Sequence, residues 1–363
     1  FYYAVPSGFK AICNANLPDP SIALPDKHFD MLFWTGDNTS RNITGLEFDP
    51  DFVWAKNRTI AYSPEVYDTV RGDNKRIFPD SGNDEVSNGA LSFGVTGGYS
   101  LSAGGSLNDD DGTNDIVAWN WKGGGSASSN SDGSLTSSVS ANTTAGFSIV
   151  SWTSTGTTGS TIGHGLGVKP DVIILKSRNT SSNQPWRVYH YDLGATKSLM
   201  LDDDDVVATQ TGVWNDTEPT SSVFTVGSFG STNENTKNYI AYCFNGVAGY
   251  SKFGSYTGNG NDDGTFVYTG FSPAWLMIKN INYQYGYWLM LDNKRRTFNP
   301  NGPSSSLYAD SNSVENTFGD GTGIDFTSNG FKIRDDNVNV CGDGNTMVYF
   351  AFAESPFKYS RAI

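Results

Sequence analysis

Cysteine and histidine are scarce in this sequence. Its 363 residues include three of each, and Cys13, Cys243 and Cys341 are widely spaced with no Cys-x-x-Cys pair. An odd number of distant cysteines argues against a disulfide framework. Without paired cysteines or a His-Glu-x-x-His motif, we expect no zinc site. Free thiols also favour assembly in a reducing cytoplasm.

Basic residues and long apolar runs are also in short supply. Lysine and arginine number 24 against 38 aspartates and glutamates, which gives a net charge of −14 and a pI of about 4.5. Such a surface repels phosphate backbones and anionic lipid headgroups, so we expect neither nucleic acid nor a membrane surface as a partner. No apolar run approaches the roughly 18 residues that span a bilayer, so we expect no membrane insertion.

Helical periodicity is missing as well. No run of a dozen residues places apolar side chains at the spacing of one helix face. The 41 glycines, 14 prolines and many Ser, Thr, Asn and Asp residues favour turns, while aromatic residues make up 13% of the chain. Many turns combined with many aromatic and β-branched residues predict short strands. The expected fold class is therefore all-β.

An internal repeat is the clearest pattern that the sequence does contain. Three runs begin with proline and end with lysine six residues later: Pro50–Lys56, Pro170–Lys176 and Pro273–Lys279. Each run is mostly apolar and too short for a helix, so it predicts a strand buried on both faces. We expect Val53, Ile173 and Leu276 at equivalent buried positions. A period of 100–120 residues fits one sandwich domain and is too long for a solenoid.

The repeat divides the chain into three tandem β-sandwich domains of a jelly-roll or lectin-like kind. We place them at residues 28–125, 146–249 and 250–363, with a flexible Gly/Ser-rich linker at 126–145. Residues 1–27 contain four prolines and are expected to form an extended arm. Because the sequence starts at Phe1 without a methionine or signal peptide, we expect it to derive from a longer polypeptide.

Recurrent charged residues are the first candidates for chemistry. The lysine that ends each apolar run is followed by an aspartate, at Asp68, Asp192 and Asp292. An enzyme rarely needs three copies of one active site, so we interpret these groups as structural and expect no catalytic residues, no cofactor and no enzymatic activity. The acidic run 109–115 loosely resembles a calcium loop but lacks the closing glutamate. We expect no metal site there, and the runs 202–205 and 261–264 match still less well.

One aromatic segment belongs to the third repeat alone. It contains Tyr283, Tyr285, Tyr287 and Trp288, and the three tyrosines would share one face if the segment were a strand or hairpin. Exposed aromatic rings stack on sugars or anchor proteins. We therefore name these four residues as a candidate ligand-binding site. The alternative is a half-buried face that packs on its own domain.

The segment Gly8-Phe-Lys-Ala-Ile-Cys-Asn-Ala-Asn-Leu-Pro-Asp-Pro-Ser-Ile22 resembles a group of marine bacteriophage proteins. In these proteins such a segment often follows a SPRY-type domain and precedes repeats of a domain of unassigned function. The resemblance extends over nearly the whole chain, including the segments 163–170, 213–224, 253–260 and 352–359. It implies a virion structural or tail-fibre-like role, supplies no catalytic residues, and would explain the start at Phe1 by an upstream domain.

These observations predict a structural component of a phage particle, most simply a tail fibre or appendage that acts in host adhesion. The alternatives are a capsid decoration or head-fibre protein without a receptor, and a carbohydrate-binding or carbohydrate-active tailspike module. The expected partners are other virion proteins, a host cell-surface glycan or protein, and further copies of the chain, with a trimer favoured because fibres close around a symmetry axis. The expected location is the virion, after assembly in the host cytoplasm.

Overall fold

A computed structural model of the chain describes residues 16–17, 19–109, 114–180, 182–295, 305–317 and 323–360. Strands account for 42% of it and helices for 5%, so the all-β prediction is confirmed. The helices are single turns: η2 (Pro25–Lys27), α1 (Thr211–Trp214), α2 (Gly230–Asn233) and α3 (Val338–Cys341). Within the described ranges, no helix is long and apolar enough to cross a membrane.

The first repeat pairs a four-stranded sheet with a three-stranded one. The larger sheet has the order β1 (Phe29–Thr35), β7 (Asp115–Trp121), β3 (Phe52–Asn57) and β4 (Glu65–Asp68). The smaller has the order β2 (Arg41–Thr44), β6 (Gly98–Leu101) and β5 (Leu91–Val95). All neighbours are antiparallel.

The second repeat has the same central strand order in a larger sheet. This sheet runs β15 (Ala208–Thr209), β14 (Lys197–Met200), β13 (Arg187–His190), β12 (Val172–Ser177), β17 (Asn238–Phe244), β10 (Phe147–Thr153), β9 (Ser137–Asn142) and β8 (Ser128–Asn130). Its small partner sheet pairs β11 (Ser160–Gly163) with β16 (Val223–Val226). The segment 126–145 thus contains β8 and β9, and the expectation of a flexible linker is corrected there. β8 is the outermost strand of this sheet, and β9 pairs with it on one side and with β10 on the other.

The third repeat returns to the same plan. Its large sheet runs β18 (Ser251–Thr257), β26 (Thr346–Pro356), β20 (Phe271–Asn280), β21 (Leu289–Asp292), β22 (Ser305–Tyr308) and β23 (Asn316–Thr317). Its small sheet runs β19 (Phe266–Tyr268), β25 (Gly330–Ile333) and β24 (Ile324–Thr327). Pro273 lies inside β20 at a β-bulge, whereas Pro50 and Pro170 precede their strands.

Strand register aligns the three repeats residue by residue. Val53 pairs with Asn120, Ile173 with Cys243 and Leu276 with Ala351, at the same place in each sheet. Val53, Ile173 and Leu276 are all fully buried, as predicted, and each belongs to the core between the large and small sheet of its own repeat.

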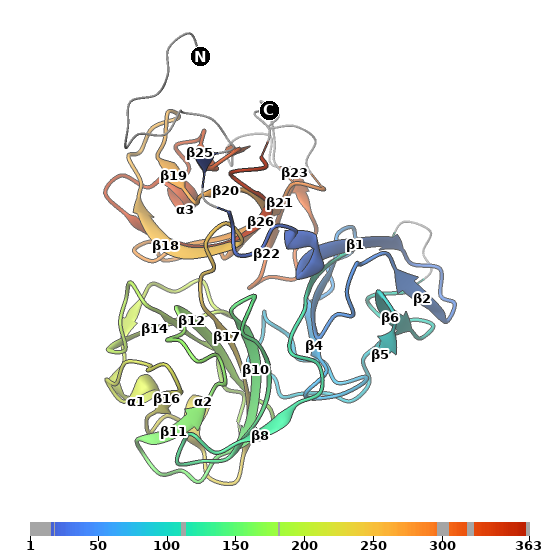
Figure 1. Cartoon of the computed structure of the whole chain (residues 1–363), viewed down its shortest axis with the longest axis vertical. Helices are drawn as coiled ribbons and strands as arrows, with labels where there is room; N and C mark the ends of the chain where they lie inside the picture. Colours follow the sequence, from blue (N-terminus) through green and yellow to red (C-terminus); the bar gives the residue numbers. More distant parts are fainter. Residues whose placement is uncertain are drawn as a thin grey trace.

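The opposite faces of the three large sheets meet in one central core. Figure 1 shows the repeats as blue, green-to-yellow and orange-to-red lobes around a common centre. All three repeats contribute side chains to this core, and those of the third repeat include Phe253, Trp275, Met277, Trp288, Phe350 and Phe352. This second buried face explains why the Pro-to-Lys runs are apolar throughout: β3, β12 and β20 are buried along their whole length.

Aromatic rings from different repeats touch in this central core. Phe52 and Tyr242 have ring centroids 4.4 Å apart, and Trp121 meets Trp275 edge-on at 5.6 Å. The cavity left among these rings measures about 10 Å³, close to the space of a single water molecule. The three repeats therefore share their largest core, in addition to the core that each repeat has between its own two sheets.

Candidate functional site

The recurrent lysines join neighbouring repeats. All three are buried, and each ammonium donates to a backbone carbonyl of a different repeat. The pairs are Lys56 to Asn312 at 3.1 Å, Lys176 to Gly82 at 2.9 Å and Lys279 to Asp203 at 3.2 Å. The first repeat therefore contacts the third, the third contacts the second, and the second contacts the first. This cyclic order closes a ring of three equivalent junctions within one chain.

Burial controls the protonation of these lysines. Desolvation lowers the pKa of Lys56 and that of Lys176 to about 8, and it also lowers the pKa of Lys279. Each ammonium is nevertheless held by carbonyl oxygens, such as that of Gln184, 2.8 Å from Lys176 Nζ. The lysines thus act as cross-links between repeats, in line with the structural interpretation from the sequence.

The recurrent acidic position also joins neighbouring repeats, in each case to the neighbour that the recurrent lysine of the same repeat does not contact. Tyr242 Oη of the second repeat donates to Asp68 at 2.7 Å, and Trp119 Nε1 of the first donates to Asp292 at 3.0 Å. The strand register places His190, and not Asp192, at the equivalent position of the second repeat. His190 stacks on Phe350 of the third repeat, with ring centroids 5.9 Å apart. The alignment of Asp192 with the other two aspartates was wrong by two residues.

Two junctions carry a further ion pair where the third carries apolar side chains. Arg178 binds Glu85 through two contacts of 2.9 Å, and Arg58 binds Glu315. Backbone bonds identify the equivalents: Glu85 N bonds Arg178 O, Glu315 N bonds Arg58 O, and Val207 N bonds Ile281 O. The junction of the second and third repeats is therefore different from the other two.

The candidate aromatic segment lies at this different junction. Residues 281–285 form bends and a turn, and residues 286–288 have no regular secondary structure, so the tyrosines do not share a strand face. Tyr285 is 63% exposed and Tyr287 40%, whereas Tyr283 is half-buried. Trp288 is fully buried in the central core and donates from Nε1 to Met200 O at 2.8 Å. Its assignment as a ligand-binding residue is therefore corrected: Trp288 joins the second and third repeats.

An acidic loop of the second repeat borders the exposed tyrosines. Tyr285 N donates to Asp204 O at 3.2 Å, and Gln284 Nε2 lies 3.5 Å from a carboxylate oxygen of Asp205. The carboxylates of Asp203, Asp204 and Asp205 have oxygens within 4.8 Å of one another, a spacing that could hold a cation. Sequence reasoning set this loop aside, because nothing local shows that it meets a segment about 80 residues away.

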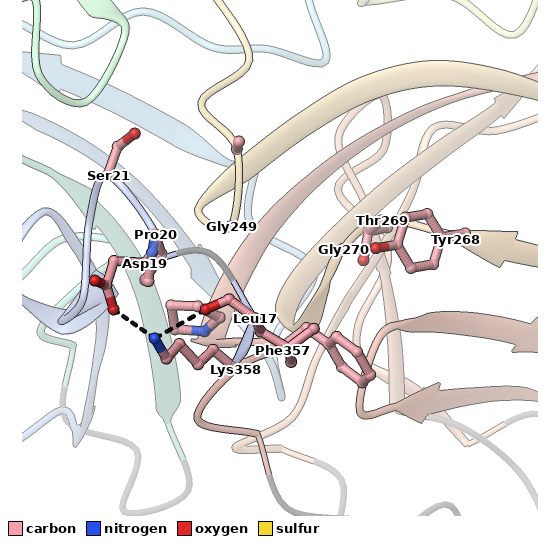
Figure 2. Close-up of a pocket in the computed structure, with 12 residues that line it drawn as sticks. Leu17, Asp19, Pro20, Ser21, Gly249, Tyr268, Thr269, Gly270, Phe357 and Lys358 are labelled. Atoms are coloured by element: carbon pink, nitrogen blue, oxygen red, sulfur yellow. Dashed lines mark hydrogen bonds and ion pairs between the residues drawn. The ribbon is translucent and has the colours of Figure 1, made fainter. Parts of the chain in front are cut away.

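A second hollow lies where the start of the described chain meets its end (Figure 2). It has a volume of about 360 Å³ and is lined by Leu17, Asp19, Pro20, Ser21, Ala248, Gly249, Tyr268, Thr269, Gly270, Pro356, Phe357 and Lys358. Lys358 Nζ binds the Asp19 carboxylate at 2.6 Å and Leu17 O at 3.0 Å. This pair fixes the N-terminal segment against the third repeat and neutralises the charged groups of the hollow.

The acidic run 109–115 lies partly outside the described residues, which omit 110–113. Asp109 accepts a hydrogen bond from Tyr62 Oη at 3.0 Å, and Asp115 accepts one from Thr35 Oγ1 at 2.9 Å. Both carboxylates thus take part in contacts within the first repeat.

One protein family matches this architecture as a whole. The family described as a domain of unknown function, DUF7483, matches residues 24–356, which includes all three repeats and the junctions between them. The chain belongs to this family. No curated protein matches the sequence. Since the DUF7483 match spans the closed ring, the ring of three repeats is contained within one family unit.

Proposed function

We propose that this DUF7483 chain is a non-catalytic structural protein of a bacteriophage particle, which acts in host adhesion as part of a tail fibre or similar appendage. The observation that supports the proposal best is the cyclic closure of the three repeats. The charged groups shared by the repeats, such as Lys56 and Asp292, are engaged in joining them. This leaves a rigid scaffold whose unshared surface can meet a receptor.

Self-association is a separate part of the proposal. The sequence argument for a homotrimer is that fibres close around a symmetry axis, which would also make a chain of small domains joined by loops rigid. The shared central core already provides that rigidity within one chain. A homo-oligomer is thus proposed from the fibre role alone, and light scattering of the purified chain tests it.

Locating the protein in a particle tests the function. Gold-labelled antibodies raised against the purified chain should bind the tail or an appendage of intact particles, and an excess of the purified chain should reduce adsorption to host cells. Labelling of the capsid shell without competition would favour the alternative, a decoration or head-fibre protein. Absence from purified particles would refute both roles.

A further inference from the structure

One backbone bond recurs in all three junctions, those of Glu85, Val207 and Glu315, and a second recurs in two of them, which can therefore be compared in more detail. In the junction of the first and second repeats, Gln184 N donates to Gly82 O at 3.0 Å. At the corresponding place in the junction of the second and third repeats, Tyr285 N donates to Asp204 O. Likewise Asn183 binds Asn83 at 2.9 Å where Gln284 approaches Asp205. One junction therefore presents short polar side chains, and the other presents an exposed ring beside carboxylates.

Tyr285 occupies its position at a conformational cost. Its φ of 75° lies in the left-handed region, where a bulky side chain costs on the order of 1 kcal/mol and glycine costs nothing. Burial of the ring does not offset this conformational cost, since 63% of the residue is exposed. Folding alone would be served better by glycine, so neither the backbone nor burial accounts for the ring of Tyr285.

The neighbouring groups define the chemistry of that contact. Tyr287, whose ring lies tilted against that of Tyr308 with centroids 5.0 Å apart, adds a second exposed aromatic surface. Asp203, Asp204 and Asp205 offer acceptors for hydroxyl or amino groups, and Gln284 offers both a donor and an acceptor. Aromatic faces beside hydrogen-bond acceptors suit a sugar ring, with its apolar C–H face and its hydroxyl edge. The carboxylates, in a chain of net charge −14, disfavour anionic sugars.

We propose that the junction of the second and third repeats is a saccharide-binding site, in which Tyr285 and Tyr287 stack on a neutral or amino sugar and the 203–205 loop accepts its hydroxyl or amino protons. This inference rests on the proposed adhesion function and names the receptor chemistry for it. The junction of the first and second repeats lacks the site, because an ion pair and polar side chains occupy the same positions.

Saturation-transfer NMR on the intact chain tests the site. The probes are D-galactose, N-acetyl-D-glucosamine and D-glucosamine, with D-glucuronic acid and N-acetylneuraminic acid as anionic counterparts. At least one neutral or amino sugar should receive saturation, and both anionic sugars should receive none. Equal transfer to the anionic sugars, or no transfer to any probe, would overturn the proposal.

Three variants localise the binding. Tyr285→Gly removes the ring but suits the backbone, so it should melt at or above the wild-type temperature and weaken sugar binding by about fivefold to tenfold. Gln184→Ala alters the corresponding position of another junction, and Tyr359→Ala removes a tyrosine that is 51% exposed elsewhere. Both controls should bind like the wild type. Wild-type affinity in Tyr285→Gly would refute the site.

The two proposals can fail separately. If labelled particles place the chain on an appendage but no sugar binds, the adhesion function stands and the saccharide site is wrong. If the sugar binds through Tyr285 but the chain is absent from particles, the site stands and the phage function is wrong.

Discussion

The ion pair between Glu85 and Arg178 offers a direct test of how the junctions are held. Glu85 is 12% exposed and Arg178 16%, so the pair is largely desolvated. Glu85→Val leaves the guanidinium of Arg178 without its carboxylate, and we expect a loss of about 3 kcal/mol, at the low end of the range for breaking buried pairs. The loss stays at that end because Arg178 retains some contact with water. Arg71, which lies 3.4 Å from the same Glu85 carboxylate, also keeps Asp68 as a partner.

The third junction supplies the matched replacement. There Val207 and Ile281 occupy the places of Glu85 and Arg178, with the same backbone hydrogen bond between them. The double variant Glu85→Val/Arg178→Ile removes both charges and installs the apolar pair that this fold already uses. Because well-packed apolar residues often replace a buried ion pair without loss, we expect its stability within about 1 kcal/mol of the wild type.

Urea unfolding of the wild type, both single variants and the double variant measures the coupling. Urea is preferred to guanidinium because a denaturant salt would screen the ion pair. The stability of the double variant should exceed the additive expectation by at least about 1.5 kcal/mol. If the two single losses simply add, the junction is not held by this pair, and the equivalence with Val207 and Ile281 has no energetic meaning.

Three further predictions follow from the shared core and the cross-links. A separately produced segment 250–360 would expose the central-core side chains of the third repeat, of which the six named above are worth about 9–18 kcal/mol, so it should lack a sharp thermal transition and bind a hydrophobic dye; cooperative melting would contradict this. Tyr242→Phe removes the bond to Asp68 and should cost about 1–2 kcal/mol in urea unfolding, whereas no loss would discount that bond. Burial lowers the pKa of Lys56 and that of Lys176 to about 8 from 10.5, so between pH 8 and roughly 9.5, below the titration of tyrosine, the unfolded chain binds more protons than the folded chain. The free energy of unfolding should therefore rise with pH in this range, by up to about 1.4 kcal/mol per pH unit for each lysine. The rise should be smaller in Lys56→Met/Lys176→Met.

The sequence predicts the strands better than it predicts their partners. The Pro-to-Lys runs identify β3, β12 and β20, and their unbroken apolar character predicts burial on both faces. The sequence does not show what covers the second face of each strand. Packing against a small sheet of the same repeat and packing against a neighbouring repeat both require apolar side chains. The assumption of independent sandwiches assigned both faces to one repeat, and the central core was missed.

Single positions in loops were harder to predict than strands. His190 replaces an aspartate and Ile281 replaces an arginine, and each change makes sense only beside its partner, Phe350 or Val207. Matching residue types along the sequence therefore selected Asp192, although the register selects His190. The candidate site had the same difficulty: Trp288 and Tyr285 look alike in sequence, yet one supports the core and the other faces solvent.

Corresponding positions of the three junctions can share a backbone hydrogen bond and still differ in their side chains. Such differences distinguish candidate functional residues from structural ones in this chain. Lys176 and Lys279 join neighbouring repeats in the same way, so the requirements of the fold are enough to explain both residues. At Tyr285 the backbone bond is retained while the side chain is large, exposed and attached to a strained residue. A requirement of the fold would act on all three junctions. The strained and exposed ring of Tyr285 belongs to one junction, and this is the basis of the proposed saccharide site.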